Sequence, residues 1–578
     1  MGILMTICKC GPSTAGTSAG ARIRFGVPLW PVVLIAFAIC WCGVAAGALA
    51  INTDRGWVQG TQEGDLTVYK GLPFAAPPVG GLRWRAPQPV KAWPGVKLLD
   101  HFSPRCMQHR MYPDNAPAEP LSEDCLYLNL WVPPHSSEKK LAVMVWIYGG
   151  GLDGGSGSIP LYAGDVLAQH GVIVVTLNYR LGVFGFLAHP ELARESATHT
   201  TGNYGLLDQL AALRWVHRNI AAFGGDPSRV TIFGQSSGSI SLSALSVSPL
   251  TKGLFKYAIG ESGGLFEPMN LLPELTEKGA EQDGLAFAAR AGASSMAALR
   301  RMPAEALMKV PFTPAIIIDG SVIDEIPVQA YRRARITPLA FMIGSNQDEG
   351  VIFLSGKKVT PKTSDKVLSN DFPSWLIKLT APSPGNTPAT AYAAAKDFEG
   401  DLRFHWDMWT WARMASRTGR PVYLYRFDHP TPCTPTEGCT EATRHGDEMP
   451  YVFGHDLKGS WSTQDRRLSQ TMVECWTHFA KTGTPNGCGL PDWPSYRTQS
   501  AVMVIGDHPH LAPMQADATM ERLDHVYRWI SAIAGHPIIA TVIVLAIVIA
   551  GIWLLIMLVR SLIAQTPAAE KPNSLKRK

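Results

Sequence analysis

The chain has 578 residues, a length that suits one large domain or several ordinary ones. Apolar residues make up 46% and charged residues 17%, which suits a globular core with additional membrane segments. The net charge of +5 is small, and no stripe of lysine and arginine alternates with aromatic residues, so nucleic acid is not expected as a partner.

The first 50 residues are typical of an export signal. Three basic residues precede a long apolar run over residues 27–50, which ends in the small-x-small pattern Ala-Leu-Ala of a cleavage site. Residues 1–50 are therefore predicted to be a secretory signal that is cut before Ile51. An uncleaved signal anchor is the alternative.

Six cysteines follow the signal segment and fall into close pairs. No Cys-x-x-Cys or histidine-rich spacing indicates zinc, and no other metal is expected. An even count with local pairing in an exported domain predicts three short-loop disulfides, whose connectivity the spacing leaves open. The six cysteines are Cys106, Cys125, Cys433, Cys439, Cys475 and Cys488.

Apolar runs and helical stretches alternate along most of the chain. Residues 56–75 are typical of a small antiparallel hairpin section, and residues 205–223 carry apolar residues at helical spacing. Residues 265–310 are predicted to be helical and to form a cap over the site. Alternation of strand and helix predicts an open, mostly parallel α/β sheet. The predicted strands are residues 141–148, 172–179, 230–233, 256–260, 340–344 and 421–427.

A glycine-rich segment, IYGGGLDGG, follows the first of these strands. Its glycines match the dinucleotide fingerprint, but no helix opens there and the next strand carries no ribose-binding acid, so this interpretation is set aside. Instead, the backbone amides of Gly150 and Gly151, together with that of Ser237, are predicted to hold a tetrahedral oxyanion.

The pattern Gly-x-Ser-x-Gly occurs twice, around Ser236 and around Ser262. A nucleophile elbow needs a strand, a sharp turn and a helix, with glycines where a side chain would collide with neighbouring backbone. Ser236 has all of these, because a strand precedes it and a long run of small residues comes after it. After Ser262 no helix start is visible, and Pro268 comes soon. Ser236 is therefore the predicted nucleophile.

A serine nucleophile needs a base, and the base needs an orienting acid. In nucleophile-elbow enzymes the order along the chain is serine, acid, histidine. The segment FMIGSNQDEGVIF places Asp348 and Glu349 at the end of a predicted strand, and ATRHGDEMPYVFG places His445 in a glycine-containing loop. On these residues alone either carboxylate could be the acid, and His445 is the predicted base.

The C-terminal region is predicted to anchor the chain in a membrane. Residues 538–559 are 22 consecutive uncharged residues, enough for a helix to cross the ~30 Å hydrocarbon core. A basic tail over residues 561–578 comes next and should stay cytoplasmic. Residues 528–560 are thus predicted to be a juxtamembrane and transmembrane helix, with residues 51–527 outside the cytoplasm, at a cell surface or in a periplasm.

Several blocks together resemble the type-B carboxylesterase/cholinesterase family. They spread over nearly all of residues 51–527, and their combination is highly specific. The blocks are GLPFAAPPVGGLRW, SEDCLYLNLWVP, VWIYGGGL, LNYRLGVFGFL, GNYGLLDQLAALRWVHRNIAAFGGDPSRVTIFGQSSG, IGSNQDEGVIF, HGDEMPYVFG and WTHFAKTGTPN. The resemblance implies an α/β-hydrolase fold, with helices on both faces of the sheet, and carboxylic-ester hydrolysis without a cofactor.

The resemblance also implies roles for single residues. It makes Ser236 the nucleophile, Glu349 rather than Asp348 the acid, and His445 the base. It gives the amides of Gly150, Gly151 and Ser237 to the oxyanion. It places Ser262 behind the acid and supports a disulfide between Cys106 and Cys125.

The chain departs from the family pattern at three places, and two of these departures bear on the choice of substrate. The cholinesterases hold choline against a tryptophan between the first two cysteines, and this chain has none there. Gln235 stands where the cholinesterases carry glutamate before the nucleophile. Both changes weaken the binding of a cation, so cholinesterase activity is not expected. Ser237 replaces the usual alanine and is expected to contribute only its backbone amide.

The sequence therefore predicts a membrane-anchored serine carboxylesterase that acts on a small, uncharged ester through an acyl-enzyme. Two alternatives are a non-catalytic adhesion protein of the same fold and a lipase at the membrane surface. The complete set of Ser236, Glu349, His445 and the glycine-rich loop favours an enzyme over an adhesion protein. The oligomeric state stays open, a homodimer included.

Overall fold

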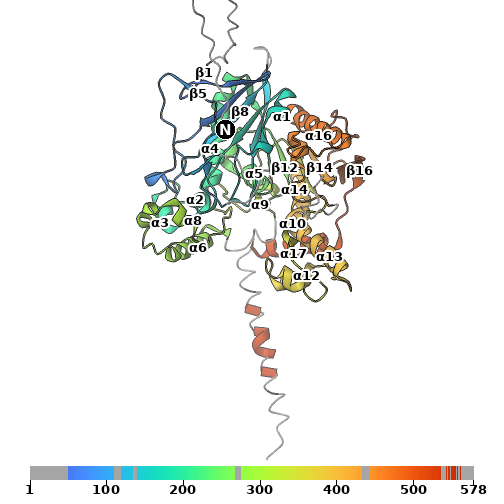
Figure 1. Ribbon diagram of the computed structural model, residues 1–578. Coiled ribbons are helices and arrows are strands. Elements are labelled where there is room, and N and C mark those ends of the chain that lie inside the picture. The colour runs from blue at the N-terminus through green and yellow to red at the C-terminus, as the bar shows by residue number, and fades with distance from the viewer. Residues whose placement is uncertain are drawn as a thin grey trace, which may run out of the picture. The chain divides into compact units, whose positions relative to one another are not determined.

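The computed structural model describes residues 50–109, 119–134, 140–266, 275–431 and 442–534, with separate helical positions between 542 and 560. The described residues belong to one unit, Gly47–Lys578. They build a sheet of eleven strands with helices packed on it (Figure 1).

The sheet is mixed, and its central strands are parallel. From β10 to β15 each pair of neighbouring strands runs in the same direction, while β8, β4 and β3 at one end and β16 at the other are antiparallel. In spatial order the strands are β16 (His510–Pro513), β15 (Ala501–Gly506), β14 (Val422–Asp428), β13 (Ala340–Asn346), β12 (Tyr257–Glu261), β11 (Gly225–Gln235), β9 (Leu141–Ile147), β10 (Val172–Leu177), β8 (Tyr127–Val132), β4 (Leu66–Pro73) and β3 (Thr61–Glu63).

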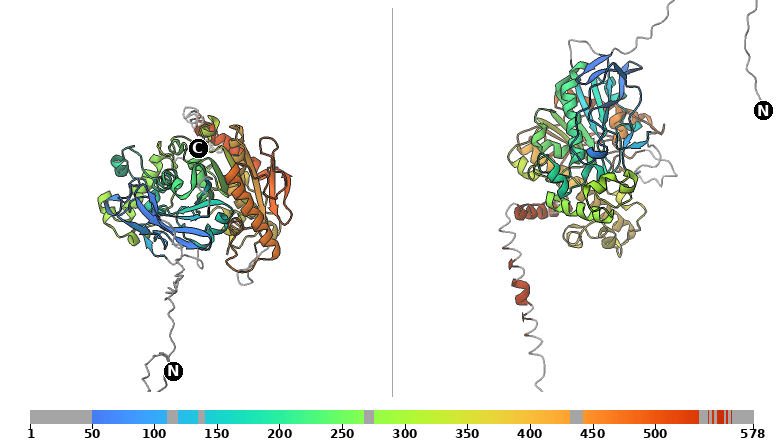
Figure 2. Two further views of the ribbon diagram at one scale, coloured as in Figure 1. Left: turned by 90° about the horizontal axis from the view of Figure 1, so that it is seen from above. Right: turned by 90° about the vertical axis from the view of Figure 1, so that its left-hand side faces the viewer.

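The central parallel strands are buried on both faces. All residues of β10, β12, β13 and β15 are buried, as expected for strands that helices cover on both sides. The predicted α/β sheet is therefore confirmed, with antiparallel strands added at both ends. Figure 2 shows these ends, with the blue N-terminal strands on one side of the molecule and the orange and red C-terminal strands on the other.

The predicted hairpin section near the start forms two antiparallel pairs. β1 (Ile51–Thr53) pairs with β2 (Gly56–Gln59) in a separate small sheet, which β5 (Val96–Leu98) extends in parallel. β3 and β4 form the second pair at the end of the large sheet. A further two-stranded piece joins β6 (Arg105–Cys106) to β7 (Leu121–Ser122).

The helices come mainly from the connections between parallel strands. α6, α7 and α8, in the predicted cap segment, pack around a small core of their own that includes Trp84, Phe184 and Phe287. The helices are α1 (Asp165–Gln169), α2 (Gly182–Phe186), α3 (Pro190–Glu195), α4 (Tyr204–Asn219), α5 (Ser237–Val247), α6 (Glu277–Arg290), α7 (Met296–Arg301), α8 (Ala304–Met308), α9 (Pro327–Arg332), α10 (Val351–Leu354), α11 (Ser364–Leu368), α12 (Ser374–Thr380), α13 (Pro388–Gly400), α14 (Trp406–Arg417), α15 (Met449–Phe453), α16 (Thr463–Thr482) and α17 (Ala518–Ala534).

Two of the predicted disulfides are present. They join Cys106 to Cys125 and Cys475 to Cys488, with Cα–Cα distances of 5.0 and 4.8 Å. Cys433 and Cys439 lie outside the described residues. Both observed bridges close short loops, as their spacing in the sequence predicts.

The two predicted membrane-associated segments are only partly described. Residues 1–49 and half of the span 538–559 lie outside the described residues. Among the helices that the structure does describe, none is long and apolar enough to cross a membrane.

Candidate active site

Ser236 lies at a sharp turn between β11 and α5. Its backbone has φ 55° and ψ −129°, a conformation that L-residues rarely adopt. The Ser236 amide donates to the carbonyl of Glu261 at 2.8 Å, which fixes the turn against the end of β12. The side chain is partly exposed, unlike its neighbours Gln235 and Ser237, which are buried. A strained turn of this kind presents the hydroxyl to a substrate.

The glycines beside Ser236 are required by the close approach of β9. A Cβ on Gly238 would lie 2.0 Å from the carbonyl oxygen of Ile147, and one on Gly234 would lie 2.7 Å from the same atom. No real Cβ tolerates such contacts, so a larger residue would push the elbow away from the sheet.

Glu349 and His445 are brought together from distant parts of the chain. Glu349 lies just beyond the end of β13, and its Oε2 lies 2.6 Å from Nδ1 of His445, which precedes α15. The Glu349 side chain is fully buried, and that of His445 is 11% exposed. An imidazole that donates from Nδ1 keeps Nε2 as an acceptor, the tautomer that a general base needs.

Contact between Glu349 and His445 lowers the pKa of the carboxyl group and raises the pKa of the imidazole, as expected of charged partners. Burial alone would raise the pKa of Glu349, but the charge on His445 and three hydrogen bonds lower it. Burial alone would lower the pKa of His445, but the charge of Glu349 and the bond to it raise that pKa. Glu349 therefore stays ionised and stabilises a protonated His445.

Ser262 and Asp348 have supporting positions. The hydroxyl of Ser262, which also has a positive φ of 53°, donates to Oε1 of Glu349 at 2.5 Å. Asp348 pairs with Lys396 and accepts from the amide of Thr443 at 3.1 Å, so it holds the segment before His445 and does not contact the imidazole. Of the two neighbouring carboxylates, Glu349 and not Asp348 therefore contacts the imidazole.

The glycine-rich loop lies against the elbow because β9 and β11 are neighbouring parallel strands, with Ile147 paired to Gly234. Gly150 and Gly151 have φ values of 119° and 64°, and their amides donate no hydrogen bond within the described residues. The Ser237 amide is the first of α5 and has no intrahelical acceptor. Three amides are thus free for an oxyanion.

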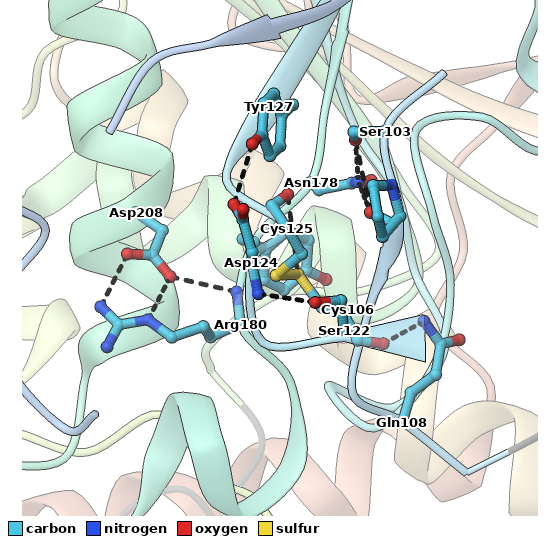
Figure 3. Close-up of a disulfide and its surroundings, with 12 residues drawn as sticks. Ser103, Cys106, Gln108, Ser122, Asp124, Cys125, Tyr127, Asn178, Arg180 and Asp208 are labelled. Carbon is cyan, nitrogen blue, oxygen red and sulfur yellow. Dashed lines mark hydrogen bonds and ion pairs between the residues drawn. A yellow bond between two sulfur atoms is a disulfide. The ribbon is translucent and has the colours of Figure 1, made fainter. Parts of the chain in front are cut away.

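The first disulfide, between Cys106 and Cys125, lies beside Gln108 (Figure 3). Gln108, two residues after Cys106, donates from Nε2 to the carbonyl of Gly155 and accepts its amide at Oε1, both at 2.8 Å. The bridge to Cys125 fixes the segment that carries Gln108. Nearby, Arg180 makes two 2.7 Å contacts with the buried carboxylate of Asp208. The two hydrogen bonds of Gln108 therefore hold the C-terminal end of the glycine-rich loop, at Gly155, in place.

Sequence reasoning missed the contacts around His445. The ring of Phe404 stacks on the imidazole with centroids 4.4 Å apart and an interplanar angle of 25°. Phe404 and His405 belong to a π-helical turn, η7 (Asp401–His405), between α13 and α14. Turns of this kind are rare and often occur at functional sites. No residue pattern in the sequence marks this one.

The same turn supports the acid through Asn346. Nε2 of His405 lies 2.8 Å from the backbone carbonyl oxygen of Asn346. The backbone amide of Asn346 donates to Oε1 of Glu349 at 2.7 Å. Asp401 lies 3.0 Å from Nδ1 of His405. Burial alone would lower the pKa of His405, but Asp401 raises it to about 9, and burial raises the pKa of Asp401 to about 6. Near neutral pH both partners are charged.

Gln235 contacts Nε2 of His445, the imidazole nitrogen that Glu349 does not contact. Its Nε2 lies 3.2 Å from Nε2 of His445, so the carboxamide donates to the atom that would take the proton of Ser236. The Ser236 hydroxyl makes no hydrogen bond with His445 within the described chain. Gln235, which directly precedes Ser236 in the chain, thus contacts the imidazole nitrogen opposite the one that Glu349 holds.

Ser237 makes a side-chain contact that the sequence did not predict. Its hydroxyl accepts a hydrogen bond from the amide of Leu152 at 3.1 Å. The residue therefore contributes more than the backbone amide expected of it.

Comparison with known proteins agrees with this geometry. The profile of the carboxylesterase family matches residues 47–524. The chain belongs to the carboxylesterase family. The fumonisin B1 esterase of Sphingopyxis macrogoltabida is 38% identical over 472 residues, which are 79% of this chain and 86% of that protein. The liver carboxylesterase of Sus scrofa is 35% identical over 541 residues, with 83% and 93% covered.

Solved structures agree with the sequence relatives. A PNB esterase superposes on this carboxylesterase with a TM-score of 0.70 at 34% identity, covering 82% of this chain and 99% of that one. The predicted family is confirmed, and the chain is a carboxylic ester hydrolase. The alternative of a non-catalytic adhesion protein has no support among these relatives.

Proposed function

We propose that this carboxylesterase hydrolyses uncharged carboxylic esters through an acyl-enzyme on Ser236, with His445 as base and Glu349 as orienting acid. The observation that carries the proposal is the 2.6 Å contact between Glu349 and Nδ1 of His445, beside a serine at a strained elbow. The free amides of Gly150, Gly151 and Ser237 support the same conclusion.

The reaction is derived from these positions. The Ser236 hydroxyl replaces Gln235 at Nε2 of His445, gives up its proton and attacks the ester carbonyl carbon. The carbonyl oxygen becomes an oxyanion and accepts from the three amides. The alcohol leaves with the proton from His445, and water then repeats the sequence on the acyl-enzyme. Glu349 stabilises the imidazolium that forms in each half-reaction.

The test uses the full chain with p-nitrophenyl butyrate as substrate and a fluorophosphonate as covalent label. Hydrolysis together with a label on the Ser236 peptide, located by mass spectrometry, is the expected result. A folded protein that neither hydrolyses nor takes the label would overturn the proposal, and a label on Ser262 would move the nucleophile. Fumonisin B1 belongs among the substrates assayed, because a relative is named for it.

The activity should rise with pH through a pKa above 6.5, the ordinary value for histidine. The net effect of burial and Glu349 is to raise the pKa of His445, and only the neutral imidazole can take the proton of Ser236. As the pH falls through this raised pKa, kcat/KM should fall in proportion to the neutral fraction. The measurement is kcat/KM between pH 5 and 9. A half-maximum below 6.5 would contradict the expectation.

We also propose that the catalytic domain is exported and held at a membrane by residues 538–559. The support is the uncharged run of 22 residues with basic residues after it. The full chain should stay in the membrane pellet after a carbonate wash, whereas a chain ending at Ala534 should be released with its activity. Release of the full chain by the wash would contradict the anchor.

A further inference from the structure

The exposed face of α12 carries two large apolar side chains. Trp375 is 47% exposed and Leu379 is 59% exposed, whereas Leu376 and Ile377 of the same helix are buried. Trp375 and Leu379 are four residues apart, so they are neighbours on one face, and the exposed Lys378 lies beside them. Isolated apolar residues on a surface are ordinary, but tryptophan and leucine together with a lysine are typical of a membrane interface.

The segment around α12 is also basic. Residues 356–380 contain five lysines and two aspartates, a net charge of +3, whereas the whole chain of 578 residues has +5. Lys357 pairs with Asp371 at 3.1 Å. The other four lysines are exposed and form no ion pair within the described residues. They are Lys358, Lys362, Lys366 and Lys378. Unpaired lysines beside exposed apolar side chains supply both of the interactions that bind a protein to an anionic bilayer.

α12 lies close to the place where the chain leaves the domain. It packs against α17, the helix that ends at Ala534, and the two helices are neighbours in Figure 1. α17 has 17 residues, a length of about 25 Å, and the uncharged run 538–559 begins four residues after its end. Four residues span at most about 14 Å, so every part of α17 lies within about 40 Å of the start of that run. The proposed anchor therefore keeps α12 near a bilayer.

We infer that the face formed by Trp375, Lys378 and Leu379, together with the other lysines of residues 356–380, docks on the surface of an anionic lipid bilayer. The inference rests on the proposed membrane anchor and adds a second contact, made by the catalytic domain itself. The lysines contact the lipid phosphates, and the two apolar side chains reach the boundary of the acyl chains. The docked domain has a fixed orientation, whereas a domain held only by its anchor turns freely.

The test uses the full chain in vesicles of phosphatidylcholine and phosphatidylglycerol, in which some phosphatidylglycerol carries a diazirine near its headgroup. After illumination, mass spectrometry locates the labelled peptides. Label is expected on residues 538–559 of the anchor and on residues 374–380 of α12. A rise in salt from about 0.1 M to 1 M shortens the Debye length from about 10 Å to 3 Å, so it should lower the label on α12 and leave that on the anchor unchanged.

Two substitutions test the two parts of the face. Lys378→Ala should lower the label on α12 by up to about fivefold, the effect of one basic residue near an anionic surface. Trp375→Ser should lower it as well, because no indole then reaches the acyl-chain boundary. Both side chains are exposed and lie outside the catalytic machinery, so the melting temperature and the hydrolysis of p-nitrophenyl butyrate should stay at wild-type values.

The matched controls are Trp57→Ser and Lys140→Ala. Trp57 is 48% exposed, nearly the same fraction as Trp375, but it belongs to the small sheet with β1 and β5, at the end of the domain opposite α12 (Figure 1). Lys140 is exposed and directly precedes β9, at the amino-terminal edge of the parallel strands, whereas α12 follows their carboxyl edge after β13. Neither control should change the label on α12.

The two labelled segments separate this inference from the proposed anchor. Label on residues 538–559 without label on α12 would overturn the docking, as would label on α12 that neither salt nor Lys378→Ala reduces. Label on α12 alone would support the docking and reject the anchor, and no label on either segment would overturn both. Dimers in detergent that Trp375→Ser dissociates would show that a second copy of the chain covers this face, which would also overturn the docking.

Discussion

Replacement of Ser236 by alanine is expected to lower kcat for p-nitrophenyl butyrate on the order of 10⁵–10⁶-fold, as loss of a serine nucleophile does elsewhere. In the proposed mechanism this hydroxyl becomes acylated. The other serine of a Gly-x-Ser-x-Gly pattern, Ser262, cannot replace it, because it is fully buried and bonded to Glu349. Fluorophosphonate labelling should disappear with the activity. Steady-state kinetics and the label intensity measure the two effects.

The control for this variant is Ser228→Ala, which changes an exposed serine on the same strand, β11. It should keep wild-type kinetics. The melting temperature of Ser236→Ala should stay close to that of wild type, since the described structure gives its hydroxyl no hydrogen bond to lose. Retained hydrolysis in Ser236→Ala would reject Ser236 as the nucleophile.

The second large effect is expected from Glu349→Gln, with kcat about 10⁴-fold lower. A carboxamide at this position can donate to Nδ1 of His445, which places the imidazole proton on Nε2 and removes the acceptor that Ser236 needs. Loss of the Glu349 charge also removes the main influence that raises the pKa of His445. Any residual activity should therefore reach half-maximum at a lower pH than in wild type.

Asp348→Asn is the matched control, because it neutralises the carboxylate that directly precedes Glu349 in the sequence. Asp348 contacts Lys396 and Thr443 but not the imidazole, so kcat should fall less than tenfold. The measurement is kcat and its pH dependence for both variants. Loss of activity in Asp348→Asn with Glu349→Gln still active would exchange the roles of the two acids.

Much of the fold could be predicted because apolar runs and glycines carry strong local signals. The strands from β9 to β14 overlap the predicted runs, because strands covered on both faces are apolar throughout, although β11 is longer than the predicted residues 230–233. The spacing of Ser236 behind β11 predicted the elbow for the same reason. Residues 56–75, which include β3, were predicted as an antiparallel hairpin section, and β3 does pair antiparallel with β4. β16, at the other end of the sheet, was not predicted, since it is short and partly exposed.

The contacts of the site depend on tertiary packing and left less trace in the sequence. The resemblance distinguished Glu349 from Asp348, whereas their positions in the sequence did not. Phe404 lies far from any motif, and only the folded chain brings it to His445. Asn346 belongs to the segment that carries Glu349, but its sequence position does not reveal the hydrogen bond from its backbone amide to that carboxylate. The effect of Gln235 was assigned to its missing charge, because its reach to Nε2 of His445 depends on the backbone conformation at the elbow.

The π-helical turn η7 makes the length of one helical segment as important as its composition. A π turn contains one residue more than an α turn, so it rotates the adjoining helix α14 by about 100° relative to a regular helix. With this rotation Phe404 covers His445 while α14 still buries Trp406 and Trp411. Deletion of one residue here would remove this rotation. Phe404 could then no longer cover His445 while Trp406 and Trp411 stay buried. In this segment, a deletion or insertion of one residue should therefore disturb the site more than a conservative side-chain exchange does.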